Sequence, residues 1–215
     1  ALELSEQMHA ELAEQCSALG IEFMSTAFDE DALDFLVGLG MRRIKVPSGE
    51  ITNHPFLRFM AAKGLPMIVS TGMADMEEVE DAISVIANER RVLGLTGELK
   101  NFVTILHCTS NYPAVVEDVN LNAMLAISRV TGLPVGYSDH TLGTIVSTAA
   151  VAMGARVIEK HFTLDKSMAG PDHAASLEPA ELKAMIQQIR MVETAFGDGV
   201  KAPRPSEIPV RALVR

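Results

Sequence analysis

Residues 65–108, LPMIVSTGMADMEEVEDAISVIANERRVLGLTGELKNFVTILHC, hold the pattern from which the fold is predicted. Two short apolar runs, at 65–72 and 101–108, flank a long segment with helical periodicity. That segment begins with acidic and ends with basic residues, the order that a helix dipole favours. Strands that are apolar throughout, without alternation, are typical of sheets covered on both faces. The stretch therefore predicts one strand–helix–strand unit.

The same alternation continues in both directions along the chain. It predicts six strands, each followed by a helix, with one more helix at 5–19 before the first strand. The predicted strands are 21–28, 42–48, 65–72, 101–108, 133–138 and 155–162. The predicted helices that follow them are 29–40, 53–64, 74–91, 119–132, 143–154 and 178–197.

Repeated strand–helix units favour either a closed barrel or an open doubly wound sheet. A dinucleotide-binding sheet loses support because no G-x-G-x-x-G follows the first strand. Polar residues end every predicted strand, and in a barrel all of those ends meet at one mouth. We therefore predict an α/β protein with a TIM (β/α)8 barrel that lacks its first two βα units in this chain. The barrel domain is expected at 1–200 and a linker at 201–215.

The composition argues against two classes of function. The 215 residues carry 28 acidic and 18 basic side chains, and a net charge of −10 is unlike that of a general nucleic-acid-binding protein. No apolar run reaches the ~18 residues of a membrane helix, and no signal peptide opens the chain. Its two cysteines, Cys16 and Cys108, and its methionines fit a reducing compartment, so we expect a cytoplasmic protein. The chain opens on a helical pattern already in progress, and we expect the natural protein to begin earlier.

His140 and His161 lie at the ends of two adjacent predicted strands. Neighbouring parallel strands run about 4.8 Å apart, so the two imidazoles could share one divalent metal ion. Water or substrate would take the remaining positions. The alternative is a pair of partly buried histidines held by hydrogen bonds.

A second group of residues predicts an anion site. Lys45 opens KVPSGE, where Ser48 and backbone N–H groups can face a phosphate or a carboxylate. Ser70, Ser138 and Lys160 could reach the same anion from other strands. The alternative is that Lys45 pairs with an acid of the barrel lining.

Three other residues each allow two interpretations. Glu50 could act as an acid or base, or it could cap the following helix. Tyr112 could cover a polar ligand, or it could pack its own loop. Asp172, in the glycine- and proline-bearing loop 165–176, could bind hydroxyl groups with the help of His173, or it could be solvated.

These strand-end motifs together resemble the sialic acid synthase family, the phosphoenolpyruvate-dependent synthases of N-acetylneuraminic acid and related nonulosonic acids. The resemblance runs in family order from residue 25 to about residue 182, and so covers nearly the whole chain. The matching strings are STAFDE, KVPSGE, STGMA, LHCTSNYPA, EDVNLNA, GYSDHT, IEKHFTLDKSMAGPDH and LEPAEL.

The resemblance implies a metal-dependent transferase that condenses phosphoenolpyruvate with the open-chain form of an N-acetylated amino sugar, such as N-acetylmannosamine. Phosphate leaves and a 2-keto acid forms. His140 and His161 would bind Mn²⁺ or Mg²⁺, which would polarise the aldehyde oxygen of the sugar. Glu50, Tyr112 and Asp172 would face the sugar, and Glu50 would also take part in proton transfer. The phosphate and carboxylate of phosphoenolpyruvate would be held by Thr26, Lys45, Ser48, Ser70, Ser110 and Ser138.

The resemblance also implies parts that this chain does not show. The family carries an acidic residue and a lysine on its first two strands, and an antifreeze-like domain after the barrel. In the family homodimer that domain covers the active site of the partner subunit. Two alternatives stay open: another phosphoenolpyruvate-dependent aldol-type synthase, making a 3-deoxy-keto-sugar phosphate, and a non-catalytic barrel that serves as a scaffold. The sequence does not fix which amino sugar is used.

Overall fold

The computed structural model describes residues 4–214, and its centre is one parallel sheet. The strands pair in chain order, β1-β2-β3-β4-β5, and all four pairings are parallel. A doubly wound sheet reverses its strand order at a switch point, and this order contains no reversal. The α/β class is thus confirmed, with a curled, barrel-like half in place of an open wound sheet; closure of the barrel and the missing units stay predictions. The strands are β1 Ile44–Val46, β2 Met67–Ser70, β3 Val103–Cys108, β4 Val135–Asp139 and β5 Ile158–Lys160.

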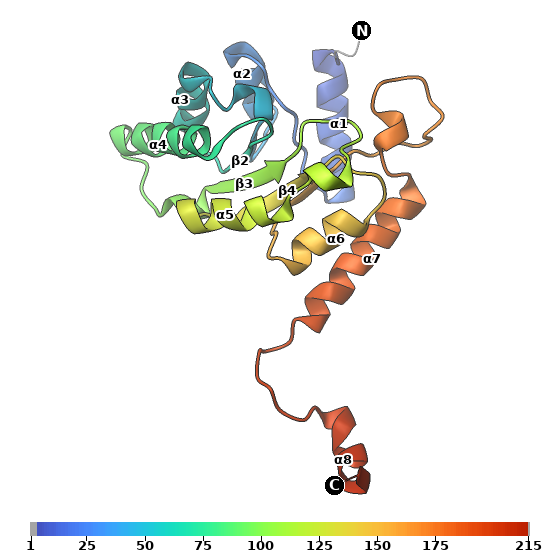
Figure 1. Cartoon of the computed structure of the whole chain (residues 1–215). Helices are drawn as coiled ribbons and strands as arrows, with labels where there is room; N and C mark the ends of the chain where they lie inside the picture. The colour runs from blue at the N-terminus through green and yellow to red at the C-terminus, as the bar shows by residue number, and fades with distance from the viewer. Residues whose placement is uncertain (1–3, 215) are drawn as a thin grey trace.

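Helices follow the strands and lie around the outside of the sheet, while α8 lies apart at the end of an extended segment (Figure 1). No helix in the part of the chain that the structure describes is long and apolar enough to span a membrane. The helices are α1 Glu6–Leu19, α2 Glu30–Gly38, α3 His54–Ala62, α4 Met76–Val92, α5 Leu121–Thr131, α6 Ile145–Ala152, α7 Pro179–Ala195 and α8 Ile208–Val214.

The predicted strand at 21–28 is wrong. The segment forms no strand, and Ala27 is its one buried residue. An apolar run becomes a strand where a neighbouring strand can satisfy its backbone N–H and C=O groups. Within residues 4–214, β1 pairs with β2 alone, and the segment 21–28 forms no backbone ladder with the open edge of β1. The other five predicted strands are confirmed.

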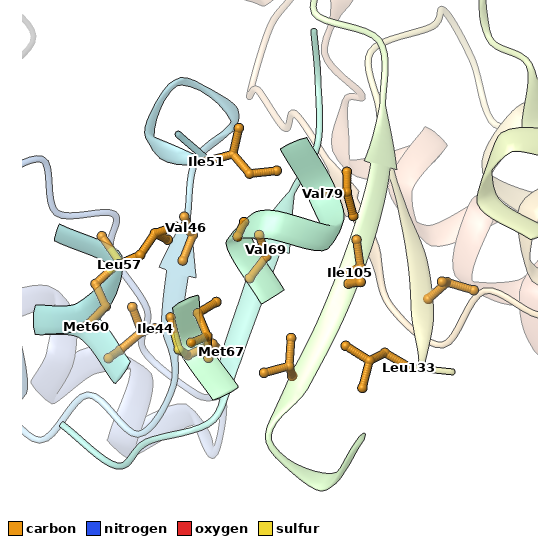
Figure 2. Close-up of a cluster of buried hydrophobic side chains, with 14 of the residues drawn as sticks. Ile44, Val46, Ile51, Leu57, Met60, Met67, Val69, Val79, Ile105 and Leu133 are labelled. Carbon is orange, nitrogen blue, oxygen red and sulfur yellow. The ribbon is translucent and has the colours of Figure 1, made fainter. Parts of the chain in front are cut away.

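The hydrophobic core lies between the sheet and the helices. Side chains on a strand alternate between its two faces, and the register puts Ile44, Met67 and Val103 in one row on the helix-facing side. Figure 2 shows these strands packing against Leu57 and Met60 of α3, which are both fully buried. We call this side the outer face and the opposite side the inner face.

The chain after α7 is irregular before it turns helical again. A short 3-10 helix, Pro205–Glu207, leads into α8. The predicted boundary between a barrel at 1–200 and a linker at 201–215 stays a prediction, and residues 1–3 and 215 of those ranges lie outside the described residues.

Candidate active site

The register of β3, β4 and β5 lines up three polar residues on the inner face. Ser138 lies opposite Cys108 on one side and opposite Glu159 on the other. Side chains repeat on the same face every second residue, so His140 and His161 follow Ser138 and Glu159 on that face, just past the strand ends. The sheet therefore delivers both histidines to its carboxyl edge.

The two imidazoles are neighbours, as their positions in the sequence predict. Their ring centroids lie 5.5 Å apart, at an interplanar angle of 68°. His140 Nδ1 lies 2.7 Å from the carbonyl oxygen of Thr109 and donates to it, which leaves Nε2 as the acceptor nitrogen. Burial lowers the pKa of His140 below its usual 6.5, which favours the neutral ring. A neutral imidazole with a fixed tautomer is the form that binds metal ions.

Tyr112 covers this histidine pair. Its ring lies 4.1 Å from that of His140 and 5.5 Å from that of His161, measured between centroids. Burial, with smaller contributions from Cys108, Asp172 and Glu159, raises the pKa of the phenol, so Tyr112 keeps its proton and can donate a hydrogen bond. Tyr112 thus packs on the histidine pair, and its role in covering a ligand stays a prediction.

Lys45 is paired with an acid of the inner face. Its side chain is 8% exposed, and its Nζ lies 3.4 Å from Glu159 Oε2. The other carboxylate oxygen of Glu159 accepts a hydrogen bond of 2.6 Å from Ser138 Oγ. The alternative drawn from the sequence, an acid partner for Lys45, is what the structure shows. Sequence reasoning missed Glu159, although its place two residues before His161 puts it on the same face.

Small polar groups gather where β1, β2 and β3 end. The Gly72 N–H donates to Ser48 Oγ over 3.0 Å, and Cys108 Sγ lies 3.4 Å from the same hydroxyl. A Cβ on Gly72 would lie 2.7 Å from Cys108 Sγ and closer still to Ser110 Oγ. The Ser70 hydroxyl is buried and has no hydrogen-bond partner among the described residues. Buried hydroxyls are nearly always bonded, so Ser70 favours a bound polar ligand here.

Other predicted residues have partners away from this group. Glu50 accepts a hydrogen bond of 2.7 Å from Asn53 Nδ2, and Asn53 is the cap of α3, so Glu50 holds the capping residue without capping the helix itself. Thr26 lines a separate hollow beside His9 and Ser25. The predicted roles of Glu50 and Thr26 in substrate binding stay predictions.

One expectation for the charged residues near the last strand is wrong. Lys160 does not reach the predicted anion site, because it lies on the outer face and pairs with Asp139 over 3.0 Å. His173 Nδ1 lies 2.8 Å from Thr163 Oγ1, and its help to Asp172 stays a prediction. Asp172 does lie beside the pair, with Oδ2 3.9 Å from His161 Nδ1.

The metal-binding side chains present could hold a divalent ion only at an open site, where water or substrate completes the coordination. Among residues 4–214 no group of three or more His, Cys, Asp and Glu residues is arranged to hold a metal. His140 and His161 would supply two nitrogens, and the remaining positions would be left for water or substrate oxygen. Such incomplete protein coordination is typical of catalytic metal sites rather than structural ones.

Comparisons with known proteins show the family to which the chain belongs. The NeuB family model matches residues 1–201. The N,N'-diacetyllegionaminic acid synthase of Legionella pneumophila is 56% identical over 215 residues, which are 100% of this chain and 59% of that protein. The enzyme of the same name from Campylobacter jejuni is 48% identical over 206 residues, 96% of this chain and 60% of that protein. The chain thus spans about three fifths of the length of these relatives.

A solved structure shares the fold over nearly the whole chain. It is the N-acetylneuraminic acid synthetase of Leptospira borgpetersenii, crystallised in complex with citrate, and it superposes with a TM-score of 0.86 at 32% identity. The match covers 98% of this chain and 70% of that protein.

Proposed function

Because the chain belongs to the NeuB family, we propose that it is the barrel part of an enzyme that condenses phosphoenolpyruvate with an open-chain N-acetylated amino sugar. The products would be a nonulosonic acid and phosphate. The observation that carries the proposal is the contact between His140 and His161 beside the group formed by Lys45, Ser138 and Glu159. This arrangement joins the proposed metal site to the proposed anion site at one edge of the sheet.

The relatives favour one class of sugar. Both sequence relatives compared above carry the name N,N'-diacetyllegionaminic acid synthase. We therefore propose a substrate with two acetamido groups, in preference to N-acetylmannosamine, which has one. Asp172 and Tyr112 would face the sugar, since both lie beside the histidine pair.

The anion site would hold phosphoenolpyruvate. Its phosphate and carboxylate must lose water on binding, and fixed hydroxyls, N–H groups and a lysine must replace that water. The unpartnered Ser70 hydroxyl and the polar group around Gly72 support this role. The proposed ligands are Thr26, Lys45, Ser48, Ser70, Ser110 and Ser138.

His140 and His161 would hold Mn²⁺ or Mg²⁺, and a bound ion of this kind would supply Lewis-acid stabilisation of the negative charge that grows on the aldehyde oxygen. The hydrogen bond from His140 Nδ1 to Thr109 keeps Nε2 unprotonated for that purpose. The new bond joins C3 of phosphoenolpyruvate to the aldehyde carbon, water adds at C2, and the C2–O bond to phosphate breaks. Glu50, whose carboxylate accepts a hydrogen bond from Asn53, is the proposed acid or base.

A homodimer and a cytoplasmic location complete the proposal. Cys16 and Cys108 are both free thiols, which fits a reducing compartment. The dimer is proposed from the family alone.

A product assay on the full-length protein tests the proposal. The protein is incubated with phosphoenolpyruvate, Mn²⁺ and either N-acetylmannosamine or a diacetamido-trideoxyhexose, and products are identified by mass spectrometry. We expect a nonulosonic acid and phosphate in equal amounts, formed fastest from the diacetamido sugar. The His161→Ala variant should make none. His54→Ala should remain active, because it changes a histidine of α3 that pairs with Asp81 of α4. Equal product from His161→Ala would contradict the site.

A further inference from the structure

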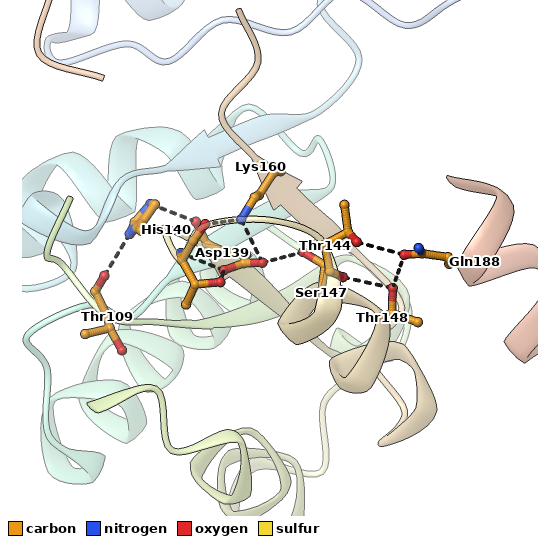
Figure 3. A network of polar contacts seen from close by, with 10 residues as sticks. Thr109, Asp139, His140, Thr144, Ser147, Thr148, Lys160 and Gln188 are labelled. Carbon is orange, nitrogen blue, oxygen red and sulfur yellow. Dashed lines mark hydrogen bonds and ion pairs between the residues drawn. The ribbon is translucent and has the colours of Figure 1, made fainter. Parts of the chain in front are cut away.

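A fully buried ion pair lies directly behind the two histidines. Asp139 Oδ2 and Lys160 Nζ lie 3.0 Å apart, and their side chains are 0% and 3% exposed. The two residues are register partners on β4 and β5, and each immediately precedes a histidine in the sequence. Figure 3 shows the pair between β4, β5 and the start of α6.

The pair belongs to a hydrogen-bond network that satisfies both oxygens of Asp139. Oδ1 accepts from the N–H and the hydroxyl of Thr141, over 2.8 and 2.7 Å, and Oδ2 accepts from Ser147 Oγ over 2.5 Å. Lys160 also donates to the carbonyl oxygen of Thr141. The network therefore ties the ends of two strands to each other and to α6.

Stability alone is a weak reason for such a pair. Desolvation of two charges largely offsets their attraction, and an apolar pair of similar volume is often at least as stable. A buried ion pair does specify one arrangement, because any other leaves a charge buried without a partner. Asp139 and Lys160 meet only in the register that the structure shows.

That register decides where the histidines point. Alternation sends Asp139 and Lys160 to the outer face, and so sends Ser138, His140, Glu159 and His161 to the inner face. A slip of one residue in either strand would exchange the two faces. The inner face has to stay open for substrate, and His161 keeps 36% of its side chain exposed there. Besides the hydrogen bond from His140 Nδ1 to Thr109, support for the two imidazoles therefore comes from behind the sheet.

We propose that Asp139 and Lys160 are positioning residues that hold His140 and His161 at the separation a shared divalent ion requires. The inference rests on the proposed function, which supplies the metal. Groups that orient metal ligands from outside typically change metal affinity by about 10- to 100-fold when they are lost. The pair acts on the metal site without touching the ion.

The test is the dissociation constant of Mn²⁺, measured by isothermal titration calorimetry on the full-length protein without substrate. The double variant Asp139→Asn/Lys160→Met removes both charges and leaves no lone buried charge. We expect its dissociation constant to rise about 10- to 100-fold while its circular dichroism spectrum stays that of the wild type. Lys160→Arg, which keeps the positive charge, should bind Mn²⁺ nearly as well as the wild type.

A stability control separates positioning from general weakening. Leu57→Ala removes a fully buried side chain of α3 on the outer face, so it should lower the melting temperature but leave Mn²⁺ affinity unchanged. Should the double variant not fold, Ser147→Ala, which deletes one hydrogen bond to Asp139, takes its place, and a smaller rise in the dissociation constant is expected.

The outcomes distinguish this inference from the proposed function. If the wild type binds Mn²⁺, His161→Ala does not, and the network variants bind as well as the wild type, the positioning role is overturned while the metal site stands. An equal loss of affinity in Leu57→Ala would also overturn it. A wild-type protein that binds no Mn²⁺ overturns the metal site and the positioning role together.

Discussion

At the scale of single residues, Glu159 is the least expected member of the site. A carboxylate beside Lys45 opposes the binding of a substrate that carries both a carboxylate and a phosphate. The hydrogen bond from Ser138 and the ion pair with Lys45 hold it in place. We therefore propose that Glu159 occupies Lys45 until an anion replaces it, and that Glu159 weakens the binding of that anion.

The variant Glu159→Gln tests this interpretation. It keeps the shape of the side chain and removes its negative charge, so phosphoenolpyruvate should bind more tightly. We expect the dissociation constant to fall about five- to thirty-fold, the factor that corresponds to ~1–2 kcal/mol. Calorimetry with phosphoenolpyruvate measures it, and Glu193→Gln, which changes an acid paired with Arg190 on α7, is the matched control. Weaker binding by Glu159→Gln would mean that Glu159 assists the anion.

His107 makes a separate prediction about pH. Burial lowers its pKa below the usual 6.5, against smaller opposing effects of hydrogen bonds to Val119 and Asn120. As pH falls below 6.5, the unfolded chain takes up this proton before the folded chain does, so the free energy of unfolding decreases. The variant His107→Gln cannot titrate and can still donate to the Val119 carbonyl oxygen. Between neutral and mildly acidic pH, its melting temperature should fall less than that of the wild type. Equal falls in the two proteins would contradict this explanation.

At the scale of elements, the alternation of strand residues explains which of the predicted site residues share a face. The apolar runs located five strands, because a strand covered on both faces is apolar throughout. A run that is apolar throughout does not show which of its residues share a face. His107, Asp139 and Lys160 end strands as the sequence shows, yet they point to the helices. Counting back by twos from His140 and His161 would have selected Ser138 and Glu159 and rejected Lys160.

The tight turn after β2 is a second feature that the sequence left open. STGMA is one of the strings that carry the family resemblance, but only coordinates show that Gly72 lies against three polar side chains. The strand predicted at 21–28 was wrong for a different reason. Its apolar pattern is real, but pairing depends on a neighbouring strand, which a local pattern does not reveal.

Gly72→Ala should disturb the anion site. The added methyl group would meet Ser48 Oγ at 2.8 Å and Cys108 Sγ at 2.7 Å, so the side chains must move, at a cost of about 1–3 kcal/mol. We expect weaker phosphoenolpyruvate binding by calorimetry, together with a lower melting temperature. Gly38→Ala on α2 is the control, because nothing lies within 4 Å of its Cβ and the helix gains roughly 0.5–1 kcal/mol. Unchanged phosphoenolpyruvate binding by Gly72→Ala would show that this turn is not part of the anion site.

At the scale of the whole molecule, the sheet of the described residues has two unpaired edges. The five strands follow one another in order, and β1 and β5 form the two edges of the sheet. Barrels remove such edges by pairing them. Because the relatives are longer than this chain, we propose that further strands close the sheet and that residues 21–27 pair with them.

Hydrogen exchange tests this by comparing the full-length protein with the 215-residue chain. In the full-length protein the backbone amides of residues 21–27 should exchange slowly, as those of a paired strand do. In the 215-residue chain the same amides should exchange fast, since no strand contains them. The amides of β3, which is paired on both sides, serve as the internal reference. Equal exchange at 21–27 in both lengths would contradict closure through this segment.

The most direct measurement is a crystal structure of the full-length protein grown with Mn²⁺ and phosphoenolpyruvate, with anomalous data collected to locate manganese. The account predicts one manganese peak about 2 Å from a nitrogen of both His140 and His161, with phosphoenolpyruvate against Lys45 and Ser70. Manganese elsewhere, or phosphoenolpyruvate bound away from these side chains, would contradict it.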